Sequence, residues 1–356
     1  MRNKENIIEL MNHLRTVSNK EIHFDEESIM ADYQEKDTNH QSLSIKILSI
    51  FGGIMACLAF LGFVFMMQIF DSQIGAGILG VICIAGSSLI SRISGKTIID
   101  TLSVSFFITG FSLLGLALST EGDTIYPVFI AFALCTLFLV QSYILSFISI
   151  LIINGSIFAL AQVNHIYHLT SAIIILQTIF TTYLFLQEAK IITKSKVLSK
   201  LYDPIRTGMI FSFILTLAFL GFGSFFRVTE YYYDWIPSVM IVITILYVIS
   251  LLFKTLQVTN TLYKIAIYAL TVLVLSPTLL TPTIAGAILI MLLSFYTHYK
   301  TGFVLSIIAL ICFIGRFYYD LQFTLLTKSI LLFGSGIFFL AMYFFAHKKL
   351  TAHEKI

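Results

Sequence analysis

Residues 125–162 read IYPVFIAFALCTLFLVQSYILSFISILIINGSIFALAQ and contain no Asp, Glu, Lys or Arg. A helix needs about 20 apolar residues to cross a hydrocarbon core that is roughly 30 Å thick. The helices of soluble proteins, by contrast, carry polar and charged residues on their solvent-facing side. The stretch is long enough for two crossings, with a turn expected near Gln141 and Ser142. It therefore predicts two consecutive membrane-spanning helices.

The composition extends this interpretation to the whole chain. Hydrophobic residues make up 58% and charged residues only 12% of the 356 residues, whereas about 25% of an average soluble domain is charged. The mean hydropathy is +0.92. We therefore predict an all-α, polytopic integral membrane helix bundle of about 12 transmembrane helices. The predicted spans are residues 47–70, 73–91, 99–118, 125–141, 144–162, 170–187, 208–226, 236–253, 264–278, 283–298, 302–318 and 326–346.

The positions of the basic residues predict how these spans are oriented. Loops on the cytoplasmic side of a membrane are enriched in Lys and Arg. If the N-terminus is inside, the inner segments hold 19 of the 22 basic residues, and only Arg227, Arg316 and Lys328 fall outside. Both termini are therefore predicted to be cytoplasmic, and a reporter fused after Ile356 is expected to lie in the cytoplasm.

Polar segments are predicted at both ends of the chain. Residues 1–44 are predicted to form a cytoplasmic tail with a short amphipathic helix followed by an acidic linker. The transmembrane domain is expected to cover residues 45–346. Residues 347–356 then form a short cytoplasmic C-terminal tail.

The transmembrane domain divides into two predicted halves. A basic cytoplasmic loop, 188–207, separates residues 47–187 from residues 208–346. The sequence LAFLGF occurs at 58–63 and again at 217–222, in the first span of each half. Both of these spans run from inside to outside, which a parallel repeat requires. The layout is consistent with a 6+6 parallel repeat, and a chance match between two apolar segments is the alternative.

A glycine-rich motif lies at the beginning of the second span. Gly75-Ala-Gly77-Ile-Leu-Gly80 matches the dinucleotide fingerprint G-x-G-x-x-G. That fingerprint needs a preceding strand and a helix N-terminus that faces the pyrophosphate. Within an apolar span, small residues instead allow two helices to approach closely. The motif therefore predicts close helix packing and no cofactor.

The sequence indicates neither a metal site nor a nucleic-acid interface. His165 and His168 are three residues apart in a predicted external turn, but a metal site needs three or four ligands and no third one is evident nearby. The basic residues lie in short turns, and the formal net charge is only +3. We therefore expect no metal, no cofactor and no nucleic-acid partner, with the lipid bilayer as the main environment.

Three polar residues within the spans are candidates for function, because such groups are costly at membrane depth. Asn154 and Gln177, in the fifth and sixth spans, are expected to form hydrogen bonds between helices. Asp100 lies near the inner end of the third span, where it is either solvated at the interface or functional.

Charged and aromatic residues are predicted to gather at the outer surface. Arg316 and Asp320 are four residues apart on one span and are expected to form an ion pair. The aromatic residues of this patch are typical of a membrane-interface belt, and they also suit a docking surface. The predicted patch consists of Arg227, Glu230, Tyr232, Asp234, Trp235, Arg316, Asp320 and Lys328.

Two segments resemble a known family. Residues 49–63, SIFGGIMACLAFLGF, and residues 101–118, TLSVSFFITGFSLLGLAL, are similar to those of bacterial inner-membrane proteins that carry a domain of unknown function. The resemblance implies the bacterial inner membrane as the location. It also implies a membrane-anchored periplasmic GDYXXLXY-domain protein as a neighbour, and it supplies no catalytic residue and no substrate.

Three functions remain open at this stage. The sparse buried charge and the external aromatic turn favour a non-enzymatic scaffold or accessory component for an envelope partner. The six-plus-six layout and the interruption at Pro277 and Pro282 favour a small-solute transporter or permease. An enzyme acting on a lipid-linked substrate is the least favoured, because the predicted external loops are short and lack clusters of acidic residues or histidines.

Overall fold

The computed structural model describes residues 72–92, 97–119, 122–140, 142–222, 235–257 and 260–320, with scattered residues between 52 and 66 and between 326 and 344. These residues form helices and turns, and no strand occurs among them. The helices are α4 (Gln73–Arg92), α5 (Thr97–Ala117), α6 (Ile125–Leu139), α7 (Tyr143–Val163), α8 (Tyr167–Leu186), α9 (Glu188–Lys194), α10 (Lys196–Gly221), α11 (Ile236–Thr255), α12 (Thr261–Leu275), α13 (Pro282–Tyr296) and α14 (Lys300–Asp320), with the 3₁₀ turns η2 (Gly122–Thr124) and η3 (Ser276–Leu280).

The surface of these helices is apolar, as a membrane protein requires. Eight helices in the described part of the chain are long and apolar enough to cross a membrane. Large hydrophobic side chains lie on the outside, among them Ile74 at 77% and Leu176 at 67% exposure. Such a surface is unfavourable in water and favourable in hydrocarbon. The predicted class, a polytopic α-helical membrane protein, is confirmed, whereas the orientation across the membrane stays a prediction.

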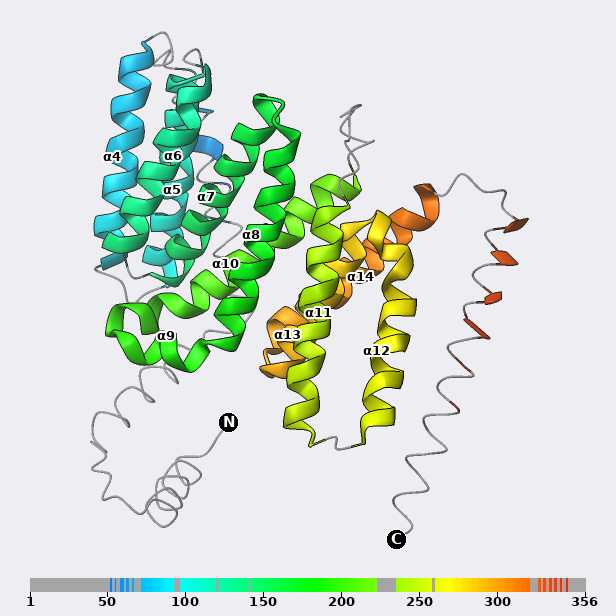
Figure 1. Cartoon of the computed structure of the whole chain (residues 1–356). Coiled ribbons are helices and arrows are strands. Elements are labelled where there is room, and N and C mark those ends of the chain that lie inside the picture. Colours follow the sequence, from blue (N-terminus) through cyan, green and yellow to red (C-terminus); the bar gives the residue numbers. More distant parts are fainter. Residues whose placement is uncertain are drawn as a thin grey trace, which may run out of the picture.

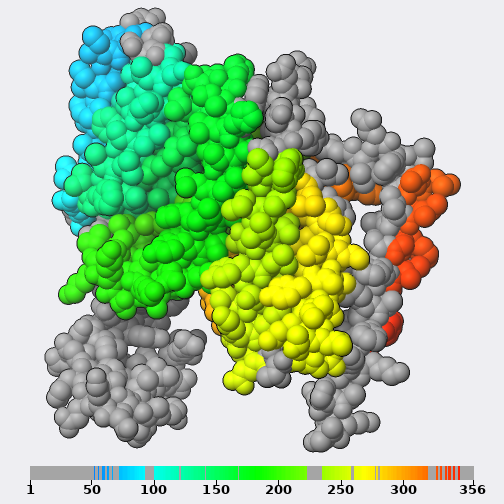
Figure 2. Space-filling view, in the orientation of Figure 1, coloured from blue at the N-terminus to red at the C-terminus, as the bar shows by residue number. Residues whose placement is uncertain are grey.

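The helices form two packed groups that meet along α7 and α10 (Figure 1). One core lies among α4, α5, α6 and α7, around residues such as Phe107 and Phe111. The other lies among α8, α10, α11, α13 and α14, around residues such as Phe213 and Leu289. Figure 2 shows the green helices of the middle of the chain in direct contact with the yellow ones that follow.

The core of the second group crosses the predicted boundary between the halves. Helix α8 belongs to the first predicted half, yet Ile174 and Phe185 of this helix lie in the core of the later helices. The two packed groups therefore do not coincide with the predicted halves. The first and twelfth predicted spans fall largely outside the described residues, and the 6+6 repeat stays a prediction.

Glycines bring α4 and α5 into close contact. A Cβ atom built on Gly80 would lie 2.9 Å from the Gly110 carbonyl oxygen, and one built on Gly110 would lie 2.9 Å from the Gly80 carbonyl oxygen. Ser103 Oγ also donates a 2.7 Å hydrogen bond across the crossing to the Ser87 carbonyl oxygen. For Gly80, this confirms that the G-x-G-x-x-G motif serves helix packing.

The segment predicted as a basic loop, 188–207, is helical. It forms α9 and the first turns of α10, which begins after an N-cap in which Ser195 Oγ accepts a hydrogen bond from the Val197 amide. Leu201 and Tyr202 are buried on the inner side of this segment. Apolar residues at helical spacing therefore outweigh the basic residues between them, and the prediction of a loop is corrected.

The interruption near Pro277 and Pro282 separates two short helices. Helix α12 continues into the 3₁₀ turn η3, and α13 begins at Pro282. Each helix has 15 residues, which corresponds to about 22 Å at 1.5 Å per residue. Proline fixes φ and lacks an N–H donor, so it suits the first turn of a new helix. The two predicted spans here are therefore helices shorter than a full crossing.

Candidate functional site

A polar cluster joins the middle of α7 and of α8 to the C-terminal part of α10. Gln177 of α8 donates from Nε2 to Asn154 Oδ1 of α7 at 3.2 Å and to Thr216 Oγ1 of α10 at 3.3 Å. Asn154 is the twelfth of 21 residues in α7, and Gln177 is the eleventh of 20 in α8. Each of these two residues thus takes part in a hydrogen bond between helices. Polar side chains so far from both helix ends bind one another because lipid offers them no partner.

Ser212 lies one turn before Thr216 on α10. Its carbonyl oxygen accepts a 2.9 Å hydrogen bond from Thr216 Oγ1. Its own hydroxyl is buried and has no hydrogen-bond partner among the described residues, and the same is true of Gln177 Oε1. Ser212 is only 4% exposed. Buried polar atoms without a partner cost free energy, so each one needs a reason.

The polar cluster, defined as Asn154, Gln177, Ser212 and Thr216, borders a cavity of about 670 Å³. Asn154, Ser212 and Thr216 line it directly, and most of the remaining wall is apolar. Cavities that hold small molecules typically measure about 300–1,000 Å³ and combine apolar walls with a few polar groups. The lining residues are Leu151, Asn154, Gly155, Phe158, Ser212, Leu215, Thr216, Ala218, Phe219, Phe222 and Arg316.

Arg316 of α14 brings a positive charge to one end of this cavity. Its Nε donates a 3.2 Å hydrogen bond to the Gly221 carbonyl oxygen at the end of α10. The centre of the guanidinium lies 5.6 Å from the centroid of the Phe222 ring. The cavity thus has a cation at the C-terminal end of α10, with Thr216 about one and a half turns and Ser212 about two and a half turns earlier on the same helix.

Only part of the predicted external patch is described. Trp235 precedes α11 and is 66% exposed, and Arg316 lines the cavity. Arg227, Glu230, Tyr232, Asp234 and Lys328 lie outside the described residues, as does the side chain of Asp320. The pair between Arg316 and Asp320 and the gathering of the patch therefore stay predictions.

A charged and aromatic cluster lies toward the other end of α10. The Arg206 side chain is only 8% exposed and pairs with Glu188 of α9 at 3.3 Å and with Asp203 at 2.6 Å. Its guanidinium also stacks on Tyr299 at 3.9 Å and on Tyr202 at 4.9 Å. A guanidinium is well suited to such a site, because its plane stacks on rings while its edges bind carboxylates.

Hydroxyl groups next to Arg206 connect three more elements. Tyr143 of α7 donates to Thr207 Oγ1 at 3.2 Å, and Thr207 Oγ1 lies 2.8 Å from the hydroxyl of Tyr299, between α13 and α14. Tyr202 donates to the carbonyl oxygen of Leu184 at 2.9 Å. These bonds hold α7, α8, α10 and the α13–α14 turn together at this end of the bundle.

The sequence did not indicate Arg206, Ser212 or Thr216 as site residues. The sequence analysis assigns Arg206 to the basic inner loop 188–207, because the predicted span begins at residue 208. Ser212 and Thr216 are four residues apart in an apolar run, and this spacing is the signal that could have identified them. Asp100 lies in the first turn of α5 and is half-buried; the hydrogen bonds that define the polar cluster do not include it.

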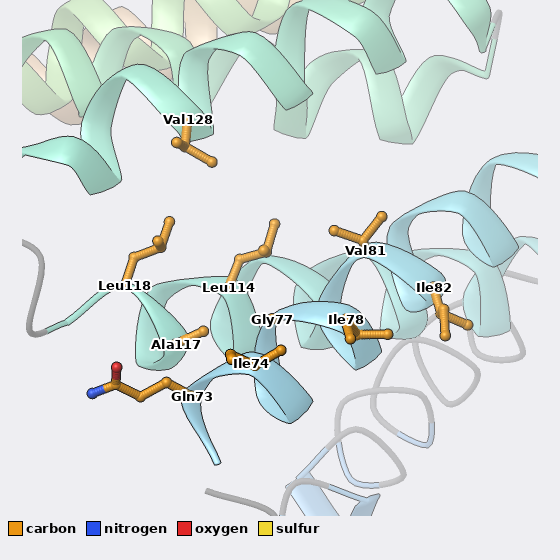
Figure 3. Close-up of a pocket in the computed structure, with 10 residues that line it drawn as sticks. All are labelled: Gln73, Ile74, Gly77, Ile78, Val81, Ile82, Leu114, Ala117, Leu118 and Val128. Atoms are coloured by element: carbon orange, nitrogen blue, oxygen red, sulfur yellow. The ribbon is translucent and has the colours of Figure 1, made fainter.

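A second hollow of about 550 Å³ differs from the first in chemistry. It lies between α4, α5 and α6, and its walls are almost entirely aliphatic. In Figure 3, Val128 of α6 faces Leu114 of α5 and Leu118, which directly follows α5, across the hollow, while Gln73 lies at its edge. No ionisable residue lines it. Its chemistry matches the acyl chains of the surrounding lipid and contains no group that would select a solute.

The fold and the cavity together define a multi-pass membrane protein with a polar cluster among its apolar helices. Residues 42–349 match the family model described as "Domain of unknown function (DUF4401)". The chain therefore belongs to this family, and the match extends well beyond the two segments that carry the resemblance in the sequence. The chain matches no curated protein and no solved structure.

Proposed function

We propose that the protein is a membrane carrier that binds a small solute in the cavity between α7, α10 and α14. The observation that supports this most is Ser212, a residue that lines a cavity of about 670 Å³ and whose buried hydroxyl has no hydrogen-bond partner among the described residues. A bound solute would supply both the missing hydrogen bond and the missing packing. Of the two main functions that the sequence leaves open, this favours the small-solute transporter or permease.

A purely structural role accounts poorly for this cavity. Unless something occupies a space of this size, the side chains that line it lose packing contacts, which costs free energy. A larger apolar residue at Gly155 or Ser212 would fill part of it, and one at Ser212 would also remove the unpartnered hydroxyl. A site that keeps both the space and the hydroxyl is instead typical of ligand binding.

Helix α10 is suited to couple binding to movement. It carries Ser212 and Thr216 beside the cavity and Arg206 and Thr207 in the contacts at the other end. Under the predicted sidedness, the Arg206 contacts close the cytoplasmic end, while the cavity lies toward the outer end. A change in the tilt of α10 would then alter both ends together, as alternating access requires.

The test is to fill the cavity without disturbing its walls. A Cβ atom on Gly155 meets no heavy atom within 4 Å, so Gly155→Leu places a side chain at the cavity without a backbone clash. Gly86 of α4 is equally open and lies outside the cavity, so Gly86→Leu is the matched control. Small molecules extracted from purified protein are quantified by mass spectrometry, and their efflux from proteoliposomes is then measured.

We expect wild type and Gly86→Leu to retain the same compound and to release it from proteoliposomes, and Gly155→Leu to lose both properties. Equal retention and equal efflux in all three proteins would rule out the proposal. So would a complete absence of bound compound from the wild type.

The scaffold function has one specific observation in its favour. Trp235 is exposed where α11 begins, and a Trp at such a place suits a docking surface for the proposed partner, a membrane-anchored periplasmic protein in a bacterial inner membrane. The same purified samples discriminate the two functions. A co-purifying partner that persists in Gly155→Leu and is lost in Trp235→Ala would favour the scaffold.

A further inference from the structure

We propose that the contacts of Arg206 with Glu188 and Tyr299 form a gate, which holds one end of α10 closed and opens when α10 moves. Asp203 and Tyr202 lie on α10 together with Arg206, so they remain in contact with it in both arrangements. This inference rests on the proposed function for the purpose of the movement, and it names the residues that control the movement.

Two sets of partners surround the Arg206 guanidinium. Asp203 accepts a 2.6 Å hydrogen bond from Nη2, and the Tyr202 ring centroid lies 4.9 Å away; both residues belong to α10. Glu188, at the beginning of α9, pairs with Nη1 at 3.3 Å, and Tyr299, between α13 and α14, stacks at 3.9 Å. Because only the first set shares a helix with Arg206, a movement of α10 separates only the second set.

Asp203 lowers the free energy that this separation costs. Removal of the only partner of a buried charge is strongly destabilising, because it leaves the charge uncompensated. The Arg206 side chain is only 8% exposed, but Asp203 stays paired with it when Glu188 is released. The side chain of Glu188 is 37% exposed, on a helix that also carries Lys190 and Lys194, so its carboxylate is hydrated after release. The pair between α9 and α10 is therefore able to break without leaving a buried charge alone.

The closed arrangement also leaves one donor of the guanidinium unsatisfied. Arg206 Nε is buried and has no hydrogen-bond partner among the described residues. A buried donor without a partner costs free energy. When the contacts with Glu188 and Tyr299 open, water reaches the guanidinium and supplies the missing bond. This reduces the difference in free energy between the closed and the open arrangement, as a gate requires.

Helix α9 connects α8 to α10 and allows movement between them (Figure 1). It has seven residues and lies between two residues outside the helical region, Gln187 (φ −107°, ψ 23°) and Ser195 (φ −159°, ψ 144°). A helix this short is not stable alone in water. Its structure depends on Ile191 and Ile192, which pack against the core that contains Tyr202. Protection of the α9 amides from hydrogen exchange therefore reports whether the gate is closed.

Hydrogen exchange of the α9 amides is measured by mass spectrometry on the full-length protein in phosphatidylcholine nanodiscs, without added solute. Glu188→Gln removes the charge that pairs with Arg206, so we expect exchange about fivefold faster than in the wild type, the value of one net hydrogen bond. Lys194→Gln is the matched control, because it removes the charge at the other end of α9. Both charges favour the helix dipole, and loss of that effect alone should change exchange by less than about twofold.

Asp203→Asn distinguishes a gate from a static contact. In this variant Glu188 is the one carboxylate that still pairs with Arg206 among the described residues. The attraction between α9 and α10 then increases, and the α9 amides should exchange about threefold more slowly than in the wild type. In a static cluster, loss of either carboxylate would weaken the same end of the bundle, and exchange would be faster in both variants.

Two results would overturn this inference. One is α9 exchange in Asp203→Asn that is as fast as in the wild type or faster, and the other is equal exchange in Glu188→Gln and Lys194→Gln. Thermal unfolding identifies any variant that fails to fold. Glu188→Asp, whose side chain is one carbon shorter, and Asp203→Ser then take the place of the two carboxylate variants, with the same expected directions. The proposed function fails separately, because the test with Gly155→Leu follows a bound compound and the exchange is measured without one.

Discussion

The α4–α5 crossing and the α7–α8–α10 crossing show two ways of joining helices in a bilayer. At the first, Gly80 and Gly110 let the two backbones approach until no space remains for a methyl group. At the second, Asn154, Gln177 and Thr216 connect the three helices through hydrogen bonds beside an open cavity. The first crossing is closely packed, whereas the second leaves space that a ligand could occupy.

The difference shows where to look for function in a chain of apolar helices. Lipid tails are as apolar as the helices, so burial of apolar surface contributes little and close packing has to hold a helix pair together. A crossing that gives up close packing therefore loses stability. At the α7–α8–α10 crossing the hydrogen bonds offset part of this loss, and we infer that a bound solute offsets the rest.

The largest expected effect comes from a methyl group at the closed crossing. Gly110→Ala should lower the free energy of unfolding by about 2 kcal/mol, because the new Cβ would lie 2.6 Å from Ile84 Cγ1 and 2.9 Å from the Gly80 carbonyl oxygen. Gly86→Ala is the matched control on the same pair of helices, because it meets no atom within 4 Å. It should raise the free energy of unfolding by up to about 1 kcal/mol. Equilibrium unfolding in bicelles measures both, and equal effects would contradict the close approach.

A smaller effect is expected from the hydrogen bonds of the open crossing. Gln177→Leu removes the bonds to Asn154 and Thr216 and should lower the free energy of unfolding by about 1 kcal/mol, because interhelical hydrogen bonds in membranes average about 0.6 kcal/mol. A double-mutant cycle with Asn154→Leu should give a coupling free energy of about 0.6 kcal/mol. A coupling of zero would mean that the two residues do not interact.

The smallest effect distinguishes two buried serines. Ser103 Oγ donates across the closed crossing to the Ser87 carbonyl oxygen, so Ser103→Ala should lower the free energy of unfolding by about 0.6 kcal/mol. Ser212 Oγ has no partner among the described residues, so Ser212→Ala should leave stability unchanged while it weakens solute binding. If Ser212→Ala destabilised the empty protein as much as Ser103→Ala, its hydroxyl would have a structural partner and the comparison would fail.

Much of the fold could be predicted, because a span is a local property of the sequence. Each span needs only a sufficient run of apolar residues, and the helices from α4 to α8 begin and end within a few residues of their predicted bounds. The beginning of α10 was misplaced by twelve residues, since the basic residues before 208 obscured the apolar spacing of Leu201, Tyr202 and Ile205. Hydropathy indicates which segments are apolar enough to enter lipid. It does not indicate where a helix such as α10 begins when its first turns are polar.

The site was harder to predict, because it depends on which helices become neighbours. Asn154 and Gln177 were identified singly, as polar residues in apolar spans. Thr216, the partner of Gln177, could not be chosen among the other serines and threonines of the chain without knowing that α10 packs against both α7 and α8. The role of Arg206 depends in the same way on Tyr299, which is far away in the sequence.

The contact between Gly80 and Gly110 also limits how this protein is able to change through mutation. A glycine codon altered at a single base encodes glycine again, a stop, or a residue that has a Cβ atom. At Gly110 every such Cβ would overlap Ile84 and the backbone of α4, and at Gly80 it would overlap the backbone of α5. Substitution at either position therefore requires a second, compensating change elsewhere in the pair. Gly86 lies about two turns further along α4, and a Cβ atom built there meets no atom within 4 Å. A substitution at this position therefore needs no compensating change.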